Sequence, residues 1–245
     1  MILETLLSMG MCAGSSNLDA HMLHSEQNNG IVIISTEGMS ETKTDSLLKF
    51  YDILEDASKK EKERDYKEAE KLYKESLNWH QALMLPKIIS ADIHRGLGFV
   101  YDRQGRMEES LQHCSVAYQL KPNNLEYIND LAYALAMNDS ALTRALELAK
   151  TFTGIMPEIS DGYRTLGIIY FKMGDYERAE RDLRKALELP SQEDKIYFGS
   201  IYFFLGKICE KKGEERNAEY CFKKAKELGF IKSDTTNSKN SDNNK

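Results

Sequence analysis

The sequence predicts an all-α fold, a solenoid of about five helical hairpins stacked side by side. Three observations predict it. A fixed set of large and small residues recurs at intervals of about 34 residues, a period typical of stacked repeats. Helical spacing of apolar residues continues from Asp45 to about Gly229, and only 4 prolines occur in 245 residues. The repeat array is therefore predicted to span residues 45–230.

The repeated residues alternate between large side chains and small ones. The clearest copy comprises Tyr163, Leu166, Gly167, Tyr170, Gly174, Ala179, Leu183 and Ala186. The same slots recur from His94, from Tyr202 and, more weakly, from Ile128. Small residues let two helix axes approach each other, and large residues fill the space around them. The repeats are predicted to start near residues 50, 91, 125, 160 and 199.

A glycine or a polar pair separates the two helices of each repeat. These turns are Gly105-Arg106, Asn138-Asp139, Gly174-Asp175 and Gly213-Glu214. Glycine ends a helix at low steric cost, because it readily adopts left-handed backbone angles. Pro122 and Pro157 are predicted to end the second helices of their repeats. Charged residues fill outer slots of the first and last repeats, which we interpret as polar caps.

The two ends of the chain do not share this pattern. Residues 1–44 show no helical periodicity and form an irregular N-terminal arm, in which Ile31–Ile34 is predicted to be a short strand or a docking segment. Residues 231–245 are too polar to bury apolar surface, so we expect a disordered tail.

Composition excludes several classes of protein. The net charge of -6 argues against a non-specific nucleic-acid role. No apolar run reaches the roughly 18 residues of a transmembrane helix. The cysteines lack the spacing of a zinc site, and Cys114 and Cys209 occupy packing slots. Cys209 and Cys221 are predicted to lie too far apart along their hairpin for a disulfide, so we expect free thiols.

Sequence motifs of catalysis or cofactor binding are not found. There is no G-x-S-x-G elbow, P-loop or H-E-x-x-H motif. Gly96–Gly98 is interpreted as a helix-packing site, and His21 and His24 as a surface pair without a metal. His94 is interpreted as a packed core histidine, whereas His80 and His113 have no evident partner. We therefore predict a protein that is not an enzyme and holds no cofactor or metal.

These repeats resemble the tetratricopeptide repeat family, over residues 91–230 and, more weakly, over 50–90. The resemblance implies a right-handed α-α superhelix whose concave groove is lined by the first helix of each repeat. It also implies that groove residues occupy the second, fifth, ninth and twelfth places of a repeat. The expected partner-binding residues are Asp92, Arg95, Phe99, Asp102, Asn129, Tyr133, Arg164, Ile168, Phe171, Phe203 and Lys207.

The expected lining mixes aromatic residues with charges of both signs. Aromatic residues and arginine dominate the energetics of protein interfaces. Packing between helices is the alternative explanation for Phe99, Tyr133, Ile168 and Phe203. A clamp for a peptide carboxylate is not expected, because Asp130 and Asp161 stand where cations are needed.

The leading functional expectation is a non-catalytic scaffold that binds a peptide or helix of a partner protein in its groove. One alternative is a structural subunit of a larger complex, docked through its convex face and the arm at Ile31–Ile34. Another is an assembly factor of a bacterial envelope, tethered at Cys12. Formation of a homo-oligomer through the end faces of the repeat array is a further possibility. We expect a cytoplasmic location, with export or lipid anchorage through the N-terminal segment as the alternative.

Overall fold

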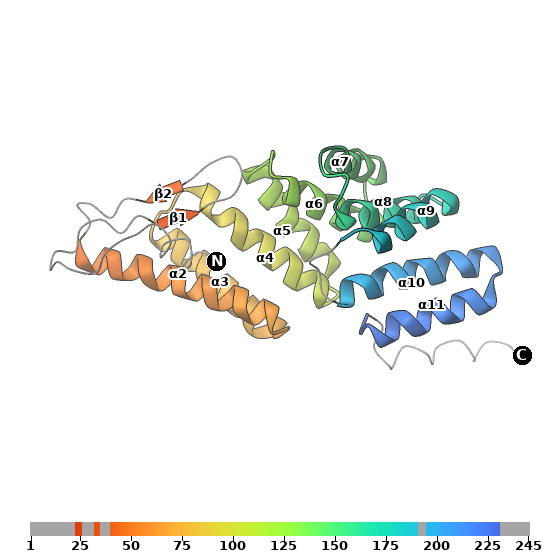
Figure 1. Cartoon of the computed structure of the whole chain (residues 1–245). Helices are drawn as coiled ribbons and strands as arrows, with labels where there is room; N and C mark the ends of the chain where they lie inside the picture. Colours follow the sequence, from red (N-terminus) through yellow and green to blue (C-terminus); the bar gives the residue numbers. More distant parts are fainter. Residues whose placement is uncertain (1–22, 26–31, 35–39, 191–194, 231–245) are drawn as a thin grey trace, which may run out of the picture. The chain divides into compact units, whose positions relative to one another are not determined.

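A computed structural model describes residues 23–25, 32–34, 40–190 and 195–230 of the chain. The chain divides into two compact units, 1–127 and 128–245, which are described separately. Consecutive helices are joined by short turns and run antiparallel in pairs (Figure 1). The predicted all-α class with about five helical hairpins is confirmed over the described residues. The predictions for Cys12, for His21 and for the tail 231–245 concern residues outside the described part.

The first unit contains a small strand pair followed by helices. Strands β1 and β2 are antiparallel, with Leu23 opposite Ile34, and β2 lies within the segment predicted to be a strand. Helix α2 packs on α3, α3 packs on α4, and α4 packs on α5. The elements are β1 (Leu23–Ser25), β2 (Val32–Ile34), α2 (Glu41–Lys62), α3 (Tyr66–Ala82), the 3-10 helix η1 (Lys87–Ile89), α4 (Ser90–Arg103) and α5 (Met107–Leu120).

The second unit consists of helices only in its described residues. Helix α6 begins in the first unit and continues into this one. Helix α8 packs on both α7 and α9, and α10 packs on α8, α9 and α11. The helices are α6 (Leu125–Met137), α7 (Leu142–Ile155), α8 (Ser160–Lys172), α9 (Tyr176–Glu188), α10 (Lys195–Lys212) and α11 (Glu215–Glu227).

The predicted turns have the backbone geometry that ends a helix. Gly105, Gly174 and Gly213 have φ angles of 77°, 82° and 75°, in the left-handed region that glycine adopts without steric cost. Asp139 takes this role between α6 and α7, with φ of 51°. At the next helix start, the Asp175 side chain accepts a hydrogen bond from the Arg178 backbone N–H and so caps α9.

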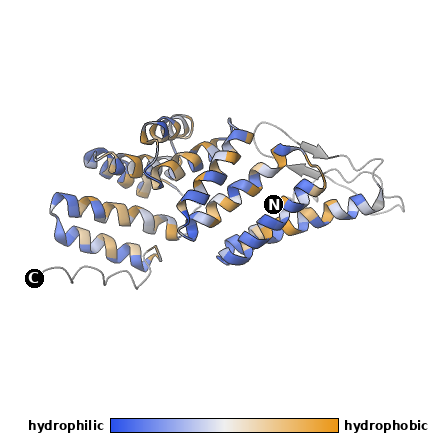
Figure 2. Cartoon of the chain, turned by 180° about the vertical axis from the view of Figure 1, so that it is seen from behind, coloured by the Kyte–Doolittle hydropathy of each residue, from blue (hydrophilic) through white to orange (hydrophobic). Residues whose placement is uncertain are grey.

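Glycines and alanines bring the two helices of a hairpin close together. A Cβ atom at Gly167 of α8 would lie 2.5 Å from Leu183 Cγ of α9, so only glycine fits there. Leu183 is fully buried, which contributes about 1.5–3 kcal/mol of hydrophobic stabilisation. Ala179 and Ala186 are also fully buried. Most helices carry both hydrophobic and hydrophilic bands (Figure 2), as expected for amphipathic helices that pack on one side.

The prediction of free thiols at Cys209 and Cys221 is confirmed. Both are free cysteines with little exposed surface, on α10 and α11 of the last hairpin. Burial raises the pKa of both thiols, and each thiol also acts on the pKa of the other across the hairpin. Every side chain leans toward the N-terminus of its own helix, so Cys221 leans toward the turn and Cys209 leans away from it. The offset between the two residues is therefore smaller at their sulfur atoms than at their backbones.

Candidate functional site

In the first unit, the predicted residues Asp92 and Arg95 belong to a polar network between α4 and α6. Asp92 accepts hydrogen bonds from the Tyr127 hydroxyl and from Lys121 Nζ, the latter at 3.1 Å. Arg95 forms an ion pair of 3.2 Å with Glu126, and both side chains remain about half exposed. Burial, followed by the charge of Asp92, raises the pKa of Tyr127 above its usual range. Asp92 is thus held in place, and Arg95 stays accessible.

A tyrosine of α3 extends this network toward α2. The Tyr73 ring packs against Gly96 of α4, where an added Cβ atom would lie 2.3 Å from the ring. Its hydroxyl donates a 2.7 Å hydrogen bond to Glu61 of α2. Burial, together with the charge of Glu61, raises the Tyr73 pKa, so the hydroxyl keeps its proton and remains a donor. Glu61 and Tyr73 were absent from the predicted site.

Phe99 of α4 is largely engaged in packing. Its ring contacts Tyr66 of α3, with 6.4 Å between ring centroids. The Arg103 guanidinium also lies over the Phe99 ring, 4.6 Å from its centroid. Both Phe99 and Asp102 are half-buried. The packing explanation therefore accounts for much of the Phe99 side chain, and a partner would reach only its remaining surface.

In the second unit, the predicted residues Tyr133 and Arg164 form a stack with Tyr197. The Arg164 guanidinium of α8 lies 4.5 Å from the Tyr133 ring of α6 and 4.6 Å from the Tyr197 ring of α10. Tyr197 is buried, and its hydroxyl shares a 2.8 Å hydrogen bond with Ser160. Ser160 in turn donates to the Ala186 carbonyl oxygen at 2.6 Å. These contacts fix the arginine between two aromatic rings and join three first helices.

Asn129 lies one helical turn before Tyr133 on α6 and has an unusual environment. Its side chain is 6% exposed. Among the described residues, its Oδ1 atom is buried and has no hydrogen-bond partner. A buried polar atom in this state costs about 1–3 kcal/mol, and here the surrounding protein encloses it.

Among the remaining predicted residues of this unit, Ile168 is buried, and Phe171, Phe203 and Lys207 are half-buried. Ile168 is fully buried, so the groove role expected for it is wrong and packing explains it. Phe171 contacts Tyr176 and Phe204, with centroid distances of 5.8 and 5.4 Å. Phe203 packs instead toward α11 and the segment after it, 5.9 Å from Phe222 and 5.3 Å from Phe230. Lys207 lies 5.8 Å from the Phe203 ring and pairs with Glu210 at 3.0 Å.

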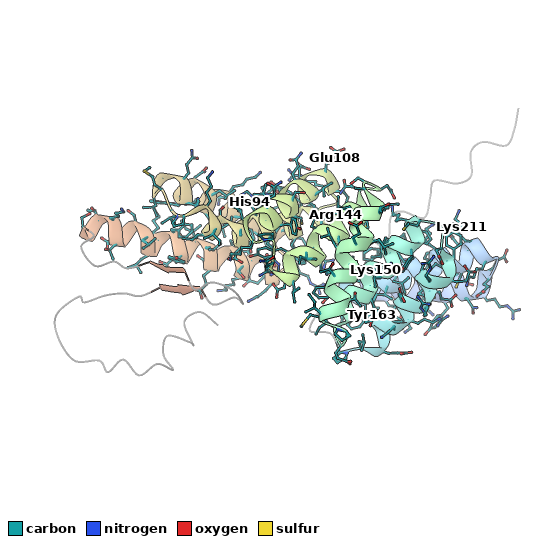
Figure 3. All side chains as sticks on the ribbon, turned by 90° about the horizontal axis from the view of Figure 1, so that it is seen from above. His94, Glu108, Arg144, Lys150, Tyr163 and Lys211 are labelled. Atoms are coloured by element: carbon teal, nitrogen blue, oxygen red, sulfur yellow. The ribbon has the colours of Figure 1, made fainter. Side chains whose placement is uncertain are left out.

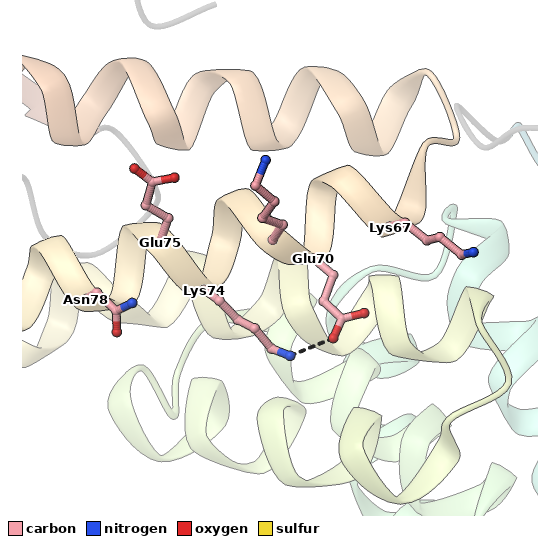
Figure 4. A pocket seen from close by; sticks show the side chains of 6 residues that line it. Lys67, Glu70, Lys74, Glu75 and Asn78 are labelled. Carbon is pink, nitrogen blue, oxygen red and sulfur yellow. Dashed lines mark hydrogen bonds and ion pairs between the residues drawn. The ribbon is translucent and has the colours of Figure 1, made fainter.

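One shallow hollow on α3 is lined by charged side chains, and it is not among the predicted sites (Figure 4). Its lysines and glutamates largely neutralise one another. Lys74 pairs with Glu70 at 2.6 Å, and Glu70 also binds Arg106 at 2.9 Å. None of the described side chains that line it is aromatic or branched apolar, so it lacks the features of a small-molecule pocket. Among described residues, no three His, Cys, Asp or Glu side chains gather as metal ligands, and no helix there is long and apolar enough to cross a membrane.

Tyr197 and Ser160 were missed because the expected positions came from four places within each repeat. Tyr197 lies in the first turn of α10, which begins at Lys195 and therefore before the repeat start predicted near residue 199. Its aromatic character and its place near a repeat boundary were the only signals in the sequence. The contact with Arg164 depends on how α10 packs on α8, which the sequence pattern does not specify.

Comparisons with known proteins agree with this architecture. Family models of the tetratricopeptide repeat match residues 160–189 and 199–228. A human protein, the O-mannosyl-transferase TMTC1, is 31% identical over 119 residues, which are 47% of this chain and 13% of that protein. The chain thus spans about an eighth of the length of this relative.

Two kinds of solved structure are similar. BtubC from P. vanneervenii has 23% sequence identity and a TM-score of 0.48, covering 76% of this chain and 88% of BtubC. The MamA RS-1 ArsTM double mutant has 18% identity and a TM-score of 0.50, covering 78% of this chain and 96% of MamA. At these identities the likeness concerns the fold alone.

The two stretches matched by family models coincide with the hairpins α8–α9 and α10–α11. The same slots and turns recur in the earlier hairpins, as the sequence pattern predicted. Arrays of such repeats form extended surfaces that bind other proteins. The chain therefore contains tetratricopeptide repeats, which family models match over residues 160–189 and 199–228.

Proposed function

We propose that this protein is a non-catalytic interaction module that holds a peptide or helix of a partner protein against its first helices. The observation that carries the proposal is the Tyr133–Arg164–Tyr197 stack, in which one arginine joins the first helices α6, α8 and α10. Tyr133 and Arg164 are only half-buried, so part of each side chain is accessible to a partner.

The stacked arginine supports the same role. A side chain that is already fixed loses little conformational entropy when a partner binds. Arginine and tyrosine are also the residue types that contribute most to binding free energy, about 2 kcal/mol or more at a true hot spot. We therefore assign the strongest partner contacts of the second unit to Tyr133 and Arg164.

In the first unit, the proposed contacts are made by Asp92, Arg95 and the exposed parts of Phe99 and Asp102. Asp92 is positioned by Tyr127 and Lys121, so its carboxylate direction is set before binding. Arg95 must leave or share its ion pair with Glu126 to bind a partner. Because exposed ion pairs contribute only about 0–1 kcal/mol, this rearrangement costs little.

Catalysis is not part of the proposal. The name of the relative TMTC1 describes a transferase, but the similar stretch is 13% of that protein. The scaffold character of the repeats favours binding over chemistry in this chain. A cytoplasmic location is proposed with it. Mass spectrometry of the mature N-terminus tests the envelope alternative, because a lipid-anchored form would begin at a modified Cys12.

The test is a pull-down from the native source with quantitative mass spectrometry. The baits are wild type, Arg95→Glu and Arg164→Glu, and Lys150→Glu on the exposed side of α7 is the matched control (Figure 3). We expect a partner whose recovery falls about tenfold or more with the first-helix variants and is unchanged with the control. Circular dichroism checks that each variant is folded.

The opposite result favours the structural-subunit alternative. If Lys150→Glu loses the partner while Arg95→Glu and Arg164→Glu retain it, the partner binds the second helices. Equal recovery with all baits contradicts a role of the first-helix residues.

A further inference from the structure

His94, interpreted from the sequence as a packed core histidine, meets His113, for which the sequence indicated no partner, between α4 and α5. His94 Nδ1 and His113 Nδ1 are 2.8 Å apart, and the ring centroids are separated by 5.0 Å. The nitrogens therefore lie between the two rings, each facing the other. Imidazole offers one donor and one acceptor when neutral, so this distance requires a proton on one Nδ1 atom and a lone pair on the other. Figure 3 shows His94 on its helix.

Charged groups of both signs surround this pair. The Tyr101 ring, 3% exposed, lies 5.3 Å from the His113 ring. Two cations lie over Tyr101: Arg106 at 4.2 Å and Lys74 at 5.7 Å. The other groups near the pair are His80 and Glu70 from α3 and Glu109 from α5. Both carboxylates already form ion pairs, Glu109 with Arg106 and Glu70 with Lys74 and Arg106, so they favour protonation of the histidines only weakly.

Burial and charge act on both rings in the same direction. Burial, followed by the charge of nearby His80, lowers the pKa of His94. Burial, followed by the charges of His94 and Lys74, lowers the pKa of His113 to about 4. At neutral pH both rings are therefore uncharged, and a single proton lies between the two Nδ1 atoms.

We propose that His94 and His113 form an acid-sensitive latch that holds α4 against α5. The ring that donates its Nδ1–H accepts a first proton from solvent at its free Nε2 atom, and the hydrogen bond persists. The second ring already carries its proton on Nε2, so it takes a further proton at Nδ1. Both rings are then positively charged and their Nδ1–H groups face each other, so the hydrogen bond is lost.

A shared proton fits the geometry better than a bound metal. In a metal site, the lone pairs of both nitrogens converge on a third point instead of on each other. Within the described chain, no group of three potential metal ligands includes these histidines. The head-on arrangement of the two Nδ1 atoms therefore favours the hydrogen bond.

The direction of the effect follows from the lowered pKa values. Free histidine has a pKa of about 6.5, so the unfolded chain takes up protons before the folded pair does. The stabilisation is present above this pH and is lost as the pH falls toward 4. Helix α4 also carries Asp92 and Arg95, so acid would weaken partner binding by the first unit. This last consequence rests on the proposed function, whereas the latch itself does not.

The experiment measures hydrogen exchange of α4 and α5 amides in the full chain between pH 7.5 and 4, corrected for the intrinsic rate at each pH. The proteins are wild type, His113→Asn and the matched control Gln112→Asn, which introduces the same residue type at the exposed neighbouring position of α5. Asparagine places an amide donor near the Nδ1 position but does not titrate. We expect exchange to rise about tenfold or more in wild type and Gln112→Asn, and about twofold or less in His113→Asn.

A second measurement keeps the proposal testable if His113→Asn is unfolded. Nitrogen-15 NMR of the wild-type histidines reports which ring nitrogen holds each proton. The latch predicts one Nδ1–H shared by the pair at pH 7 and titration below the usual value for both. Two independent titrations near pH 6.5, or equal acid sensitivity in wild type and His113→Asn, overturns the proposal.

Discussion

At Gly167 the α8 backbone lies directly against α9, and the packing leaves no room for a methyl group. An added Cβ atom would lie 2.5 Å from Leu183 Cγ and 3.1 Å from the Ala179 carbonyl oxygen. The second neighbour is backbone and cannot rotate away. Gly154 of α7 provides the opposite case, because nothing lies within 4 Å of its position and it has ordinary helical angles. Two glycines of one unit therefore respond to alanine in opposite directions.

We predict that Gly167→Ala lowers the free energy of unfolding by about 1–3 kcal/mol, because the hairpin must open to admit the methyl group. Gly154→Ala is expected to raise it by about 0.5–1 kcal/mol, since alanine restricts the unfolded chain and favours the helix. Urea titration followed by circular dichroism measures both. A loss of stability in Gly154→Ala, or none in Gly167→Ala, contradicts the packing described for α8 and α9.

The two glycines also show what a sequence pattern conveys about single residues. Gly167 was identified as a packing slot because the same slot recurs as Gly98 and Gly206. Ile168, its neighbour, was assigned to the groove from its place in the repeat, yet it is fully buried. A repeat pattern predicts which face of the helix a residue occupies only to within about one residue. Whether its side chain is exposed then depends on how the neighbouring helix packs. The unsatisfied acceptor of Asn129 is likewise a property of its surroundings, which no local pattern contains.

Between elements, Glu70 connects α3 with the turn before α5. It accepts hydrogen bonds from Lys74 at 2.6 Å, from Gln104 at 3.0 Å and from Arg106 at 2.9 Å. Burial acts to raise its pKa, but the hydrogen bonds from these three side chains outweigh that effect and lower the pKa to about 2. The carboxylate is therefore far more stable in the folded state than in the unfolded one.

We predict that Glu70→Gln destabilises the protein by about 1–2 kcal/mol at pH 7. The folded pKa is depressed, so the stabilisation is present above about pH 4.5 and is lost as the pH falls toward 2. The difference between wild type and variant should disappear across that window. The measurement is the unfolding midpoint in urea at several pH values, with the exposed Glu108→Gln as control (Figure 3). A constant difference at all pH values contradicts the ionic network.

The limits of helices were harder to predict than their order. The helical pattern was expected to begin at Asp45, whereas α2 begins at Glu41. The first buried side chains of α2 are Leu47 and Phe50, which are 2% and 0% exposed. The helical turn before them includes the exposed residues Thr42 and Lys43. Apolar periodicity cannot indicate a turn that buries no apolar side chain.

For the whole molecule, the period of the repeat was sufficient to predict the number and order of hairpins. Each hairpin makes its contacts mainly with its sequence neighbours, as α8 does with α7 and α9. Local order along the chain therefore specifies most contacts, and a recurring pattern is enough to identify them. The partner surface is different, because Arg164 meets Tyr133 and Tyr197 only when three helices are in place. The sequence therefore predicted the fold more completely than it predicted the site.

The same neighbour-to-neighbour stability leads to a prediction for the full chain. In an array of this kind the total stability is approximately a sum of terms for each repeat and each contact between adjacent repeats. Gly167→Ala should therefore increase hydrogen exchange in α8–α11 by about fivefold or more, while amides of α2 and α3 change by about twofold or less. Hydrogen-exchange mass spectrometry of the full chain measures both regions at once. An equal increase of hydrogen exchange in all helices would mean that the chain unfolds as one cooperative body. That result would contradict the sum of local stabilities assumed here.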